Sequence, residues 1–370
     1  MKITLLQENL NQGLSIVSRF VVSHPQIPIL SHIAIKTDKN RLRVSATNLE
    51  IGVNYYCGAK IGLEGGAAVL ARTFSDFVAS LPAEKVVLTE AKENLNITCG
   101  NFQANLPTSP INDFPKIPTK VNKKFSLPYQ KFIQALGSVV FATSNDDSRP
   151  VLSGVNFKFS KNTCLLSATD GYRLSFKKIS LKKEFPKLEF IIPSLVLAEL
   201  VRNRSEGDLS SLELGLASEE KQVVFFLPNL EFSSRLLEGE YPNINKVIPQ
   251  DKETTVTVDR EEFLGAVKMA AIFARESANT IKLLIANNKV QVSANAPVLG
   301  ENTSQIEAQI EGENQKVAFN FRFLIDLLSA LKSDQVVMEL QQSEKPVVFK
   351  NPKDKDFLHI IMPVKIQEEE

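Results

Sequence analysis

The same change of hydrophobic pattern occurs three times along the chain. Short runs at 2–5, 124–127 and 255–258 alternate apolar and polar residues, as a half-buried strand does. Apolar residues three or four positions apart follow each run, which favours an amphipathic helix. These helical positions are Leu10, Leu14, Val17 and Val21; then Phe132, Leu136 and Val139 or Val140; then Phe263, Val267 and Ala270. Asp259 precedes the third helix and is followed by two glutamates, which predicts an N-cap and an acidic first turn.

The residues after each helix predict strands, and then a second helix with further strands. In the first repeat the strands are 33–36, 42–44, 51–56 and 67–70, the helix is 74–81, and the last strands are 86–89, 95–98 and 102–106. In the second repeat we expect strands at 163–166 and 190–192, a helix at 195–202, and strands at 212–214, 223–226 and 230–236. In the third repeat we expect strands at 289–292 and 317–319, a helix at 323–331, and strands at 336–340, 347–349 and 357–362. Each repeat thus reads as strand, helix and three strands, twice over.

A small polar corner marks the same place in each repeat. Its copies are Ser45-Ala46-Thr47-Asn48, Ser167-Ala168-Thr169-Asp170 and Ser293-Ala294-Asn295-Ala296, which are 122 (167 − 45) and 126 (293 − 167) residues apart. Such spacing indicates an internal repeat. Proline-rich joints at 110–123 and 241–254 suggest three domains, at 1–122, 123–252 and 253–370. Only the middle copy continues as Gly171-Tyr172-Arg173-Leu174.

This pattern predicts an α+β fold of three repeated domains with the helices on one face, because two short helices per domain cannot cover both faces of the sheets. Like domains joined through their outer strands either close or polymerise. Six helices about 10 Å apart would leave a hole of only about 9 Å. Twelve helices, from two chains, would leave about 28 Å, which is enough for a DNA duplex of roughly 20 Å.

Composition and charge add few constraints. The chain has 370 residues and a net charge of +1, from 43 basic and 42 acidic side chains, so its overall charge indicates no partner. Its three cysteines have no metal-like spacing and are typical of buried, reduced thiols in a cytoplasmic protein. The N-terminus is too polar for a signal peptide, and we expect no membrane segment.

No sequence signature indicates a cofactor or an active site. His24, His32 and His359 are scattered, and the chain has neither a phosphate-binding glycine loop nor a Cys/His cluster. We therefore expect no metal and no nucleotide cofactor, and no enzyme activity. A triad of distant residues leaves no sequence signature, so a hydrolase stays open, as does a repeat-built protein-binding scaffold that does not encircle DNA.

Over essentially its whole length the chain resembles the bacterial sliding clamps, the beta subunits of DNA polymerase III. The matching stretches are Lys2-Ile3-Thr4, Pro28-Ile29-Leu30, residues 168–174, Glu240-Tyr241-Pro242 through Pro249, and Ile360-Ile361-Met362-Pro363-Val364. The resemblance implies a non-enzymatic homodimeric ring around double-stranded DNA, bound without regard to sequence. It also implies that replicative DNA polymerase, the clamp loader and repair proteins bind through short peptides in one pocket.

Carried over by position, the resemblance implies a peptide pocket made of Leu152, Thr169, Gly171, Tyr172, Arg173, Leu174, Pro242, Val247, Ile360, Met362, Pro363 and Val364. Its Leu, Val, Ile and Met residues would form an apolar floor, and Gly171 would permit close backbone approach. We expect Leu174 and Met362 to meet there, with both side chains partly exposed, and to contact one or two large apolar anchors of the peptide. Taken alone, Tyr172-Arg173 also fits a structural turn that pairs with a carboxylate, and Met362-Pro363 fits a plain strand end.

The resemblance also implies DNA contacts by the loops at His24 and Arg149, although arginine is frequent at the first position and the tyrosine pair that can follow the second is Pro150-Val151 here. The helical residues Arg72, Arg202, Lys268 and Arg275 are plausible phosphate neighbours or ordinary solvated charges. For the dimer we expect the strand at Phe102, Ala104 and Leu106 to meet Ile272 and Phe273 of the partner. Residues 367–370 read as a frayed tail.

Overall fold

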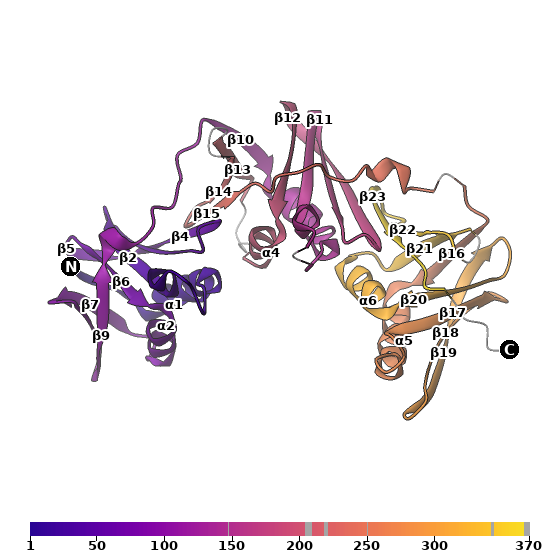
Figure 1. Ribbon diagram of the computed structural model, residues 1–370, viewed down its shortest axis with the longest axis horizontal. Helices are drawn as coiled ribbons and strands as arrows, with labels where there is room; N and C mark the ends of the chain where they lie inside the picture. Colours follow the sequence, from indigo (N-terminus) through magenta and orange to yellow (C-terminus); the bar gives the residue numbers. More distant parts are fainter. Residues whose placement is uncertain (147, 204–208, 218–220, 250, 342–343, 366–370) are drawn as a thin grey trace. The chain divides into compact units, whose positions relative to one another are not determined.

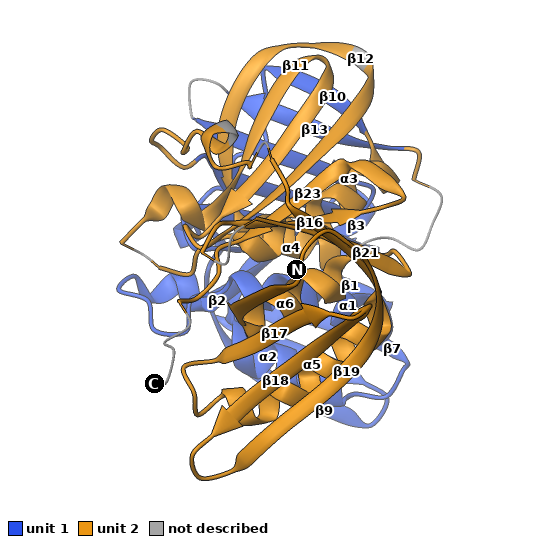
Figure 2. Cartoon of the chain, turned by 90° about the vertical axis from the view of Figure 1, so that its right-hand side faces the viewer, with its two compact units in different colours: residues 1–127, 211–236 blue, residues 128–210, 237–370 orange. Residues whose placement is uncertain are grey.

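The protein is described from a computed structural model that covers residues 1–365 except 147, 204–208, 218–220, 250 and 342–343. The tail expected at 367–370 lies outside the described residues. Two compact units make up the chain, residues 1–127 with 211–236 and residues 128–210 with 237–370 (Figure 2). Both units combine helices with extensive sheets, which confirms the α+β fold.

The first unit contains one large antiparallel sheet and two helices (Figure 1). The helices are α1 (Gln7–Val17) and α2 (Ala71–Ser80), which contact each other. In sheet order the strands are β10 (Lys123–Pro128), β13 (Ser211–Ala217), β14 (Gln222–Leu227), β15 (Leu230–Arg235), β4 (Ile51–Gly58), β3 (Arg41–Thr47), β2 (His32–Asp38), β6 (Gly66–Leu70), β9 (Phe102–Pro110), β8 (Asn94–Cys99), β7 (Lys85–Ala91), β1 (Lys2–Leu6) and β5 (Lys60–Leu63).

The second unit contains a ten-stranded sheet and four helices. The helices are α3 (Tyr129–Gly137), α4 (Ser194–Arg202), α5 (Arg260–Ala274) and α6 (Phe321–Ala330), of which α3 contacts α4 and α5 contacts α6. In sheet order the strands are β11 (Gly154–Thr169), β12 (Arg173–Pro193), β23 (Asp354–Ile361), β22 (Val347–Asn351), β21 (Gln335–Leu340), β16 (Thr254–Asp259), β19 (Gly300–Glu311), β18 (Lys289–Ala296), β17 (Thr280–Ala286) and β20 (Gln315–Asn320).

The third repeat shows the predicted plan most clearly. It runs β16-α5-β17-β18-β19 and then β20-α6-β21-β22-β23, which is strand, helix and three strands, twice. In the first repeat a further short strand, β5, pairs with β1. In the second repeat β11 and β12 are long strands that pair antiparallel, with register shifts on both sides of Lys161, whose φ is +47°. These long strands take the place of separate shorter ones.

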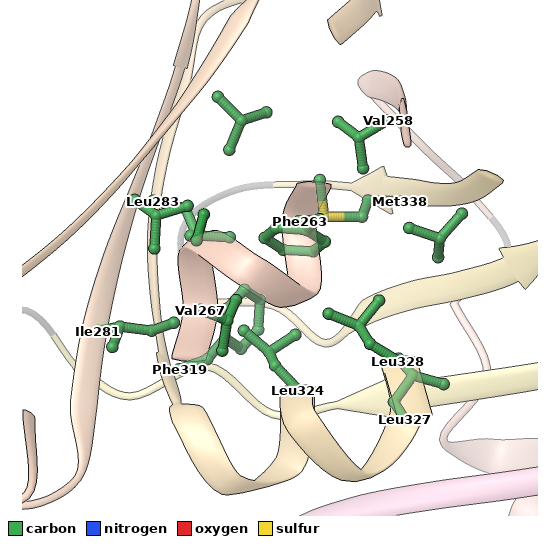
Figure 3. Close-up of a cluster of buried hydrophobic side chains, with 14 of the residues drawn as sticks. Val258, Phe263, Val267, Ile281, Leu283, Phe319, Leu324, Leu327, Leu328 and Met338 are labelled. Carbon is green, nitrogen blue, oxygen red and sulfur yellow. The ribbon is translucent and has the colours of Figure 1, made fainter. Parts of the chain in front are cut away.

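The core of the third repeat lies between its two helices and the sheet (Figure 3). Phe263 and Val267 of α5 and Leu324 and Leu328 of α6 are fully buried, as is Met338 of β21. The spacing by four places each pair on one face of its helix, and for Phe263 and Val267 of α5 this is the face that the sequence pattern predicted. Burying each such side chain contributes about 1.5–3 kcal/mol.

The predicted start of α5 is confirmed. The side chain of Asp259 accepts hydrogen bonds from the backbone N–H groups of Glu261, at 2.8 Å, and Glu262, at 2.9 Å. The cap satisfies two donors that have no partner within the helix, and the two glutamates stand where the helix dipole favours negative charge.

Successive repeats are joined by the same kind of strand pair. β4 of the first repeat pairs antiparallel with β15, the last strand of the second repeat, and Ile51 lies opposite Ser234. β12 of the second repeat pairs antiparallel with β23, the last strand of the third repeat, and Arg173 lies opposite Ile361. These two pairs, which we call seams, make each sheet continuous across a repeat boundary. The two compact units therefore divide the second repeat between them.

Two strands, each the third strand after a helix, have one open side. In β9, residues 102–107 pair with β8 on one side, and the other side is paired only at 108–110, with β6. In β19, residues 300–307 pair with β18, and the other side is paired only at 308–311, with β16. Within the described residues, the first halves of both strands therefore present free backbone groups, which can accept a further strand.

The three cysteines are free and buried, as predicted. Burial raises the pKa of Cys57 to about 12, so its thiol stays protonated and unreactive. Among the described residues, no helix combines the length and the hydropathy needed to cross a bilayer.

Candidate functional site

A tight turn between β11 and β12 forms the centre of the candidate site. The hydroxyl of Thr169 donates to the Arg173 carbonyl, at 2.6 Å, and accepts from the Gly171 N–H, at 3.1 Å. The carboxylate of Asp170 accepts from the N–H groups of Tyr172 and Arg173. Gly171 has a φ of +93°, a conformation that a side chain would strain. The locked turn leaves the Tyr172 side chain 61% exposed.

Arg173 points inward from this turn and is only 8% exposed. Its Nε donates to Asp170 at 3.0 Å, its Nη1 to Asp326 at 2.7 Å, and its Nη2 to the Phe141 carbonyl at 2.7 Å. The guanidinium also lies 4.7 Å from the ring centre of Phe323. Arg173 therefore ties β12 to α6, and the structure favours its interpretation as a structural turn residue over direct contact with a peptide.

Leu174 also belongs to the interior. It lies opposite Ile360 in the seam between β12 and β23, and with Val348 the two form a small buried cluster. Leu174 is only 3% exposed, so the expectation that its side chain is partly exposed is wrong. Ile244 and Ile248, from the segment between the second and third repeats, pack against this cluster, and the sequence analysis did not single them out.

Four large apolar residues that lie within a few positions of this cluster in the sequence are exposed. They are Tyr172, Val247, Met362 and Val364, which we call the Tyr172–Met362 surface. The N–H of Met362 donates to the Tyr172 carbonyl at 2.8 Å, which places the two residues side by side. Exposed apolar groups gathered in this way are typical of protein-binding surfaces. Met362, at 37% exposure, has the partly exposed side chain that was expected.

The other expected pocket residues differ in their exposure. Leu152 and Ile360 are buried, whereas Pro242 is exposed and Pro363 is partly buried. Arg149, which we expected to contact DNA, lies beside the turn. Its Nη1 is so close to Gly171 that a Cβ added to that glycine would be 3.1 Å from it. Its Nε donates to Asp146, so it brings a cation to the edge of the Tyr172–Met362 surface. A sequence gives no sign of this placement, because the loop brings Arg149 back to a turn 22 residues later (171 − 149).

The residues expected to meet DNA have different surroundings. His24, Lys268 and Arg275 are exposed, and the side chain of Arg72 is 3.9 Å from Asp76. Arg202 donates to Glu199, a buried carboxylate, so part of its charge is already neutralised. Over the six helices the charges balance: Arg72, Lys131, Arg202, Arg260, Lys268 and Arg322 against Glu8, Asp76, Glu199, Glu261, Glu262 and Asp326. Such helices would attract phosphates only weakly.

The expected dimer residues lie on β9, which has an open side, and on helix α5, which contacts the other such strand, β19. Phe102 of β9 is 55% exposed, and Ile272 of α5, a helix that contacts β19, is 58% exposed. Ala104 and Leu106 are partly buried. Phe273 packs against the core of the third repeat, so a substitution there would disturb that core as well as an interface.

The histidines do not form a common site. His24 is exposed, while His359 is fully buried between the rings of Phe141 and Phe349. His359 Nδ1 is 3.0 Å from the hydroxyl of Ser175, and burial lowers the pKa of His359 to about 3, with a smaller effect from the Arg173 charge. In the part of the chain that the structure describes, no three His, Cys, Asp or Glu side chains gather as metal ligands.

Three family models match successive parts of the chain. They describe the N-terminal domain of the DNA polymerase III beta subunit, at residues 1–118, its central domain, at 126–243, and its C-terminal domain, at 245–365. A beta sliding clamp of Synechocystis sp. is 30% identical over 389 residues, with 99% of this chain and 100% of the relative covered.

Solved structures give the same result. The DNA polymerase sliding clamp of Bacillus subtilis superposes with a TM-score of 0.89 at 28% identity, and 99% of this chain and 100% of that chain are covered. The DNA polymerase III beta chain of Streptococcus pneumoniae superposes with a TM-score of 0.90, at the same identity and coverage.

Proposed function

This chain belongs to the DNA polymerase III beta subunit family, the bacterial sliding clamps, and from that premise we propose that two copies close into a ring around duplex DNA. The ring would hold the replicative polymerase on the template without reading its sequence. We also propose that the protein has no catalytic activity and acts in the cytoplasm. We place its domain boundaries near residues 122 and 252.

One observation carries the proposal of a ring. In both seams the strand that ends the first half of a repeat (the short β5 aside) pairs with the last strand of the next repeat, β4 with β15 and β12 with β23. The strands left over under this rule are β19 and β9, and they are the two with an open side. β19 of one copy would pair with β9 of another, and the same contact made in return closes a two-fold ring.

Exposed apolar residues lie where this seam between two copies would form. Phe102 lies on β9, Leu299 lies immediately before β19, and Ile272 is on the adjoining helix, all at least half exposed. Burying them together stabilises the dimer, by about 25 cal/mol for each Å² removed from water. A chain that stayed a single copy would leave these side chains in water.

We predict that DNA retention depends on closure. Protein loaded onto circular duplex DNA with a clamp loader should remain bound through gel filtration and should be released when the DNA is linearised, because a ring slides off an end. Ile272→Asp should remain folded but sediment as a monomer and lose retention, because it puts a charge into the β9–β19 contact.

Leu284→Asp is the matched control, because Leu284 is an exposed leucine on β17 of the same repeat, away from the open edge of β19. It should keep both the dimer mass and the retention. Equal retention on circular and linear DNA, or a footprint at one sequence, would favour the scaffold over the clamp.

We further propose that partner proteins bind the Tyr172–Met362 surface with a short peptide that carries one or two large apolar anchors. Support comes from the locked Asp170–Gly171 turn and from the seam, which fix the backbone of Tyr172 and Met362 before any partner arrives. A site that is already ordered loses less entropy on binding. Arg149 at the edge suits an acidic residue beside the anchors.

Tyr172→Ser combined with Met362→Ala should weaken binding of a polymerase-derived peptide at least tenfold, equivalent to about 1.4 kcal/mol, because central apolar contacts dominate such sites. Fluorescence polarisation measures the affinity. The melting temperature should hardly change, since both side chains are exposed. Leu195→Ala, at an exposed leucine of α4, should bind as the wild type does. Unchanged affinity in the folded double variant would remove this surface from the proposal.

A further inference from the structure

A cavity of about 300 Å³ lies in the first unit, on the side of the sheet away from α1. On the α1 side, the hydroxyl of Tyr55 in β4 donates to Gln12 of α1 at 3.0 Å. Because side chains alternate along a strand, the neighbouring Asn54 faces the opposite side. The cavity is lined by Ala34, Lys36, Arg43, Ser45, Asn54, Ile111, Asn112, Phe114, Pro115, Lys116 and Ile117.

The outer wall of this cavity is the segment at 111–117, which leads from the first repeat to the second. Phe114 is buried against Ala34 and Ala68, and Ile111 and Ile117 pack on the same cluster. These apolar contacts hold the segment on the sheet, so the cavity is formed without a ligand. A preformed site of this kind needs little reorganisation to bind.

The cavity gathers positive charge. Lys36 of β2 and Arg43 of β3 are directly opposite each other in the antiparallel pair, and Lys116 faces them from the segment at 111–117. Like charges in this position repel each other and destabilise the strand pair. Among the described residues, none of the three cations forms an ion pair or a side-chain hydrogen bond, and Arg43 Nε is buried without a partner.

An acidic group lies close to these cations but outside the cavity lining, because Glu231 accepts the hydroxyl of Tyr56, which stands opposite Arg43 in the β3–β4 pair. The Ser45 hydroxyl donates to Asn54 Oδ1 at 2.7 Å, and Asn54 Nδ2 donates to the carboxylate of Glu231 at 3.2 Å. That carboxylate also accepts the hydroxyl of Tyr56, at 2.9 Å. No Asp or Glu side chain lines the cavity itself. The cavity is thus lined by a guanidinium whose Nε is buried and by two lysines, Lys36 and Lys116, whose side chains are exposed.

We propose that this cavity binds a phosphate-class oxyanion carried by a small molecule, with Arg43 as its main ligand and Lys36 and Lys116 beside it. A guanidinium presents parallel N–H donors that match two oxygens of a phosphate. A bound dianion would also remove the repulsion between Lys36 and Arg43. The volume is at the lower end of small-molecule sites, which suits inorganic phosphate or a small phosphorylated compound.

The same ligand would act on the connection between repeats. Lys116 belongs to the segment at 111–117, whereas Lys36 and Arg43 belong to the sheet. An anion shared by them fixes the segment to the sheet more firmly than the apolar contacts alone. Because binding occurs only in the folded state, the anion also stabilises the first unit in proportion to its concentration.

The test uses the full chain in chloride buffer, with inorganic phosphate and a nucleoside monophosphate as probes, by calorimetric titration and thermal melting. The wild type should bind phosphate saturably and melt at a higher temperature with it. Arg43→Gln should weaken binding at least tenfold. Lys36→Gln should melt above the wild type when phosphate is absent, because it removes the like-charge pair, and should gain less from added phosphate.

Lys60→Gln, which neutralises an exposed lysine on β5 of the same unit outside the cavity, should behave as the wild type does. Equal phosphate protection of wild type and Arg43→Gln would overturn the site, as would the absence of saturable binding at millimolar phosphate. If duplex DNA displaces the phosphate, the natural ligand of the cavity is a phosphate group of the DNA backbone, and the assignment to a small molecule fails.

Discussion

Arg173→Ala is expected to destabilise the protein by about 3–5 kcal/mol, the cost of removing one partner from a buried ion pair. The substitution leaves the mostly buried carboxylate of Asp170 without its cation and removes the link to Asp326 and to the Phe141 carbonyl. Because Asp326 is 43% exposed and can be solvated, we expect the lower end of this range. The urea midpoint, at an unchanged m-value, measures the loss.

The chain contains a matched control for this prediction. Arg149 and Asp146 form the same arginine–aspartate pair at the same spacing of three residues, but both side chains are nearly half exposed. Exposed pairs contribute about 0–1 kcal/mol, so Arg149→Ala should hardly move the midpoint. If the two variants lost equal stability, burial would not be what makes Arg173 important, and its role as the tie between β12 and α6 would be wrong.

Periodicity sufficed to predict the repeated elements. Helices expected at 74–81, 195–202 and 323–331 correspond to α2, α4 and α6 within a few residues, and Asp259 caps α5 as expected. Each of these helices has one apolar face that must be buried, and that requirement is local to the sequence. Lys39 and Asn40, between the strands expected at 33–36 and 42–44, form a turn that is equally local, and Lys39 has a positive φ of 52°.

The long strands were harder to predict. β12 runs through 21 residues, and lysines at 177, 178, 182, 183 and 187 obscure its alternation, because the sequence does not show which charges lie on the exposed face. β5 has no fully buried residue, so no apolar pattern marked it. β5 pairs with β1 at the start of the chain, and β12 pairs with β23 as well as with the neighbouring β11, so part of what holds each strand is a distant segment that a local pattern does not contain.

At the candidate site the sequence predicted the turn but not which side chains face outward. Tyr172, Arg173 and Leu174 are adjacent, yet only Tyr172 is exposed. Arg173 turns inward because Asp326, 153 residues away, supplies a carboxylate there. Leu174 turns inward because β23 pairs beside it. Each of these outcomes depends on the seam, which forms only when the second and third repeats come together.

The same seam should weaken in mild acid because of His359. Its pKa is about 3 in the folded protein, since burial opposes the charged ring, against 6.5 for a free histidine. Between these values the unfolded chain binds a proton that the folded chain excludes, so stability is full above pH 6.5 and falls as the pH decreases. The loss approaches about 1.4 kcal/mol per pH unit, or roughly 2 kcal/mol by pH 5.

Urea unfolding of wild type and His359→Phe between pH 8 and 5 isolates this effect. Phenylalanine keeps the ring between Phe141 and Phe349, while Ser175 still donates its hydroxyl to the Ser138 carbonyl. The variant should therefore be flatter with pH, whereas His24→Gln, at an exposed histidine, should keep the wild-type slope. Some carboxyl groups have a pKa that hydrogen bonds lower in the folded protein. Their contribution to stability is lost only as the pH falls through their ordinary pKa values of 3.8 or 4.5, which lie below the range from pH 8 to 5. Parallel curves for wild type and His359→Phe would show that His359 is not the group that titrates.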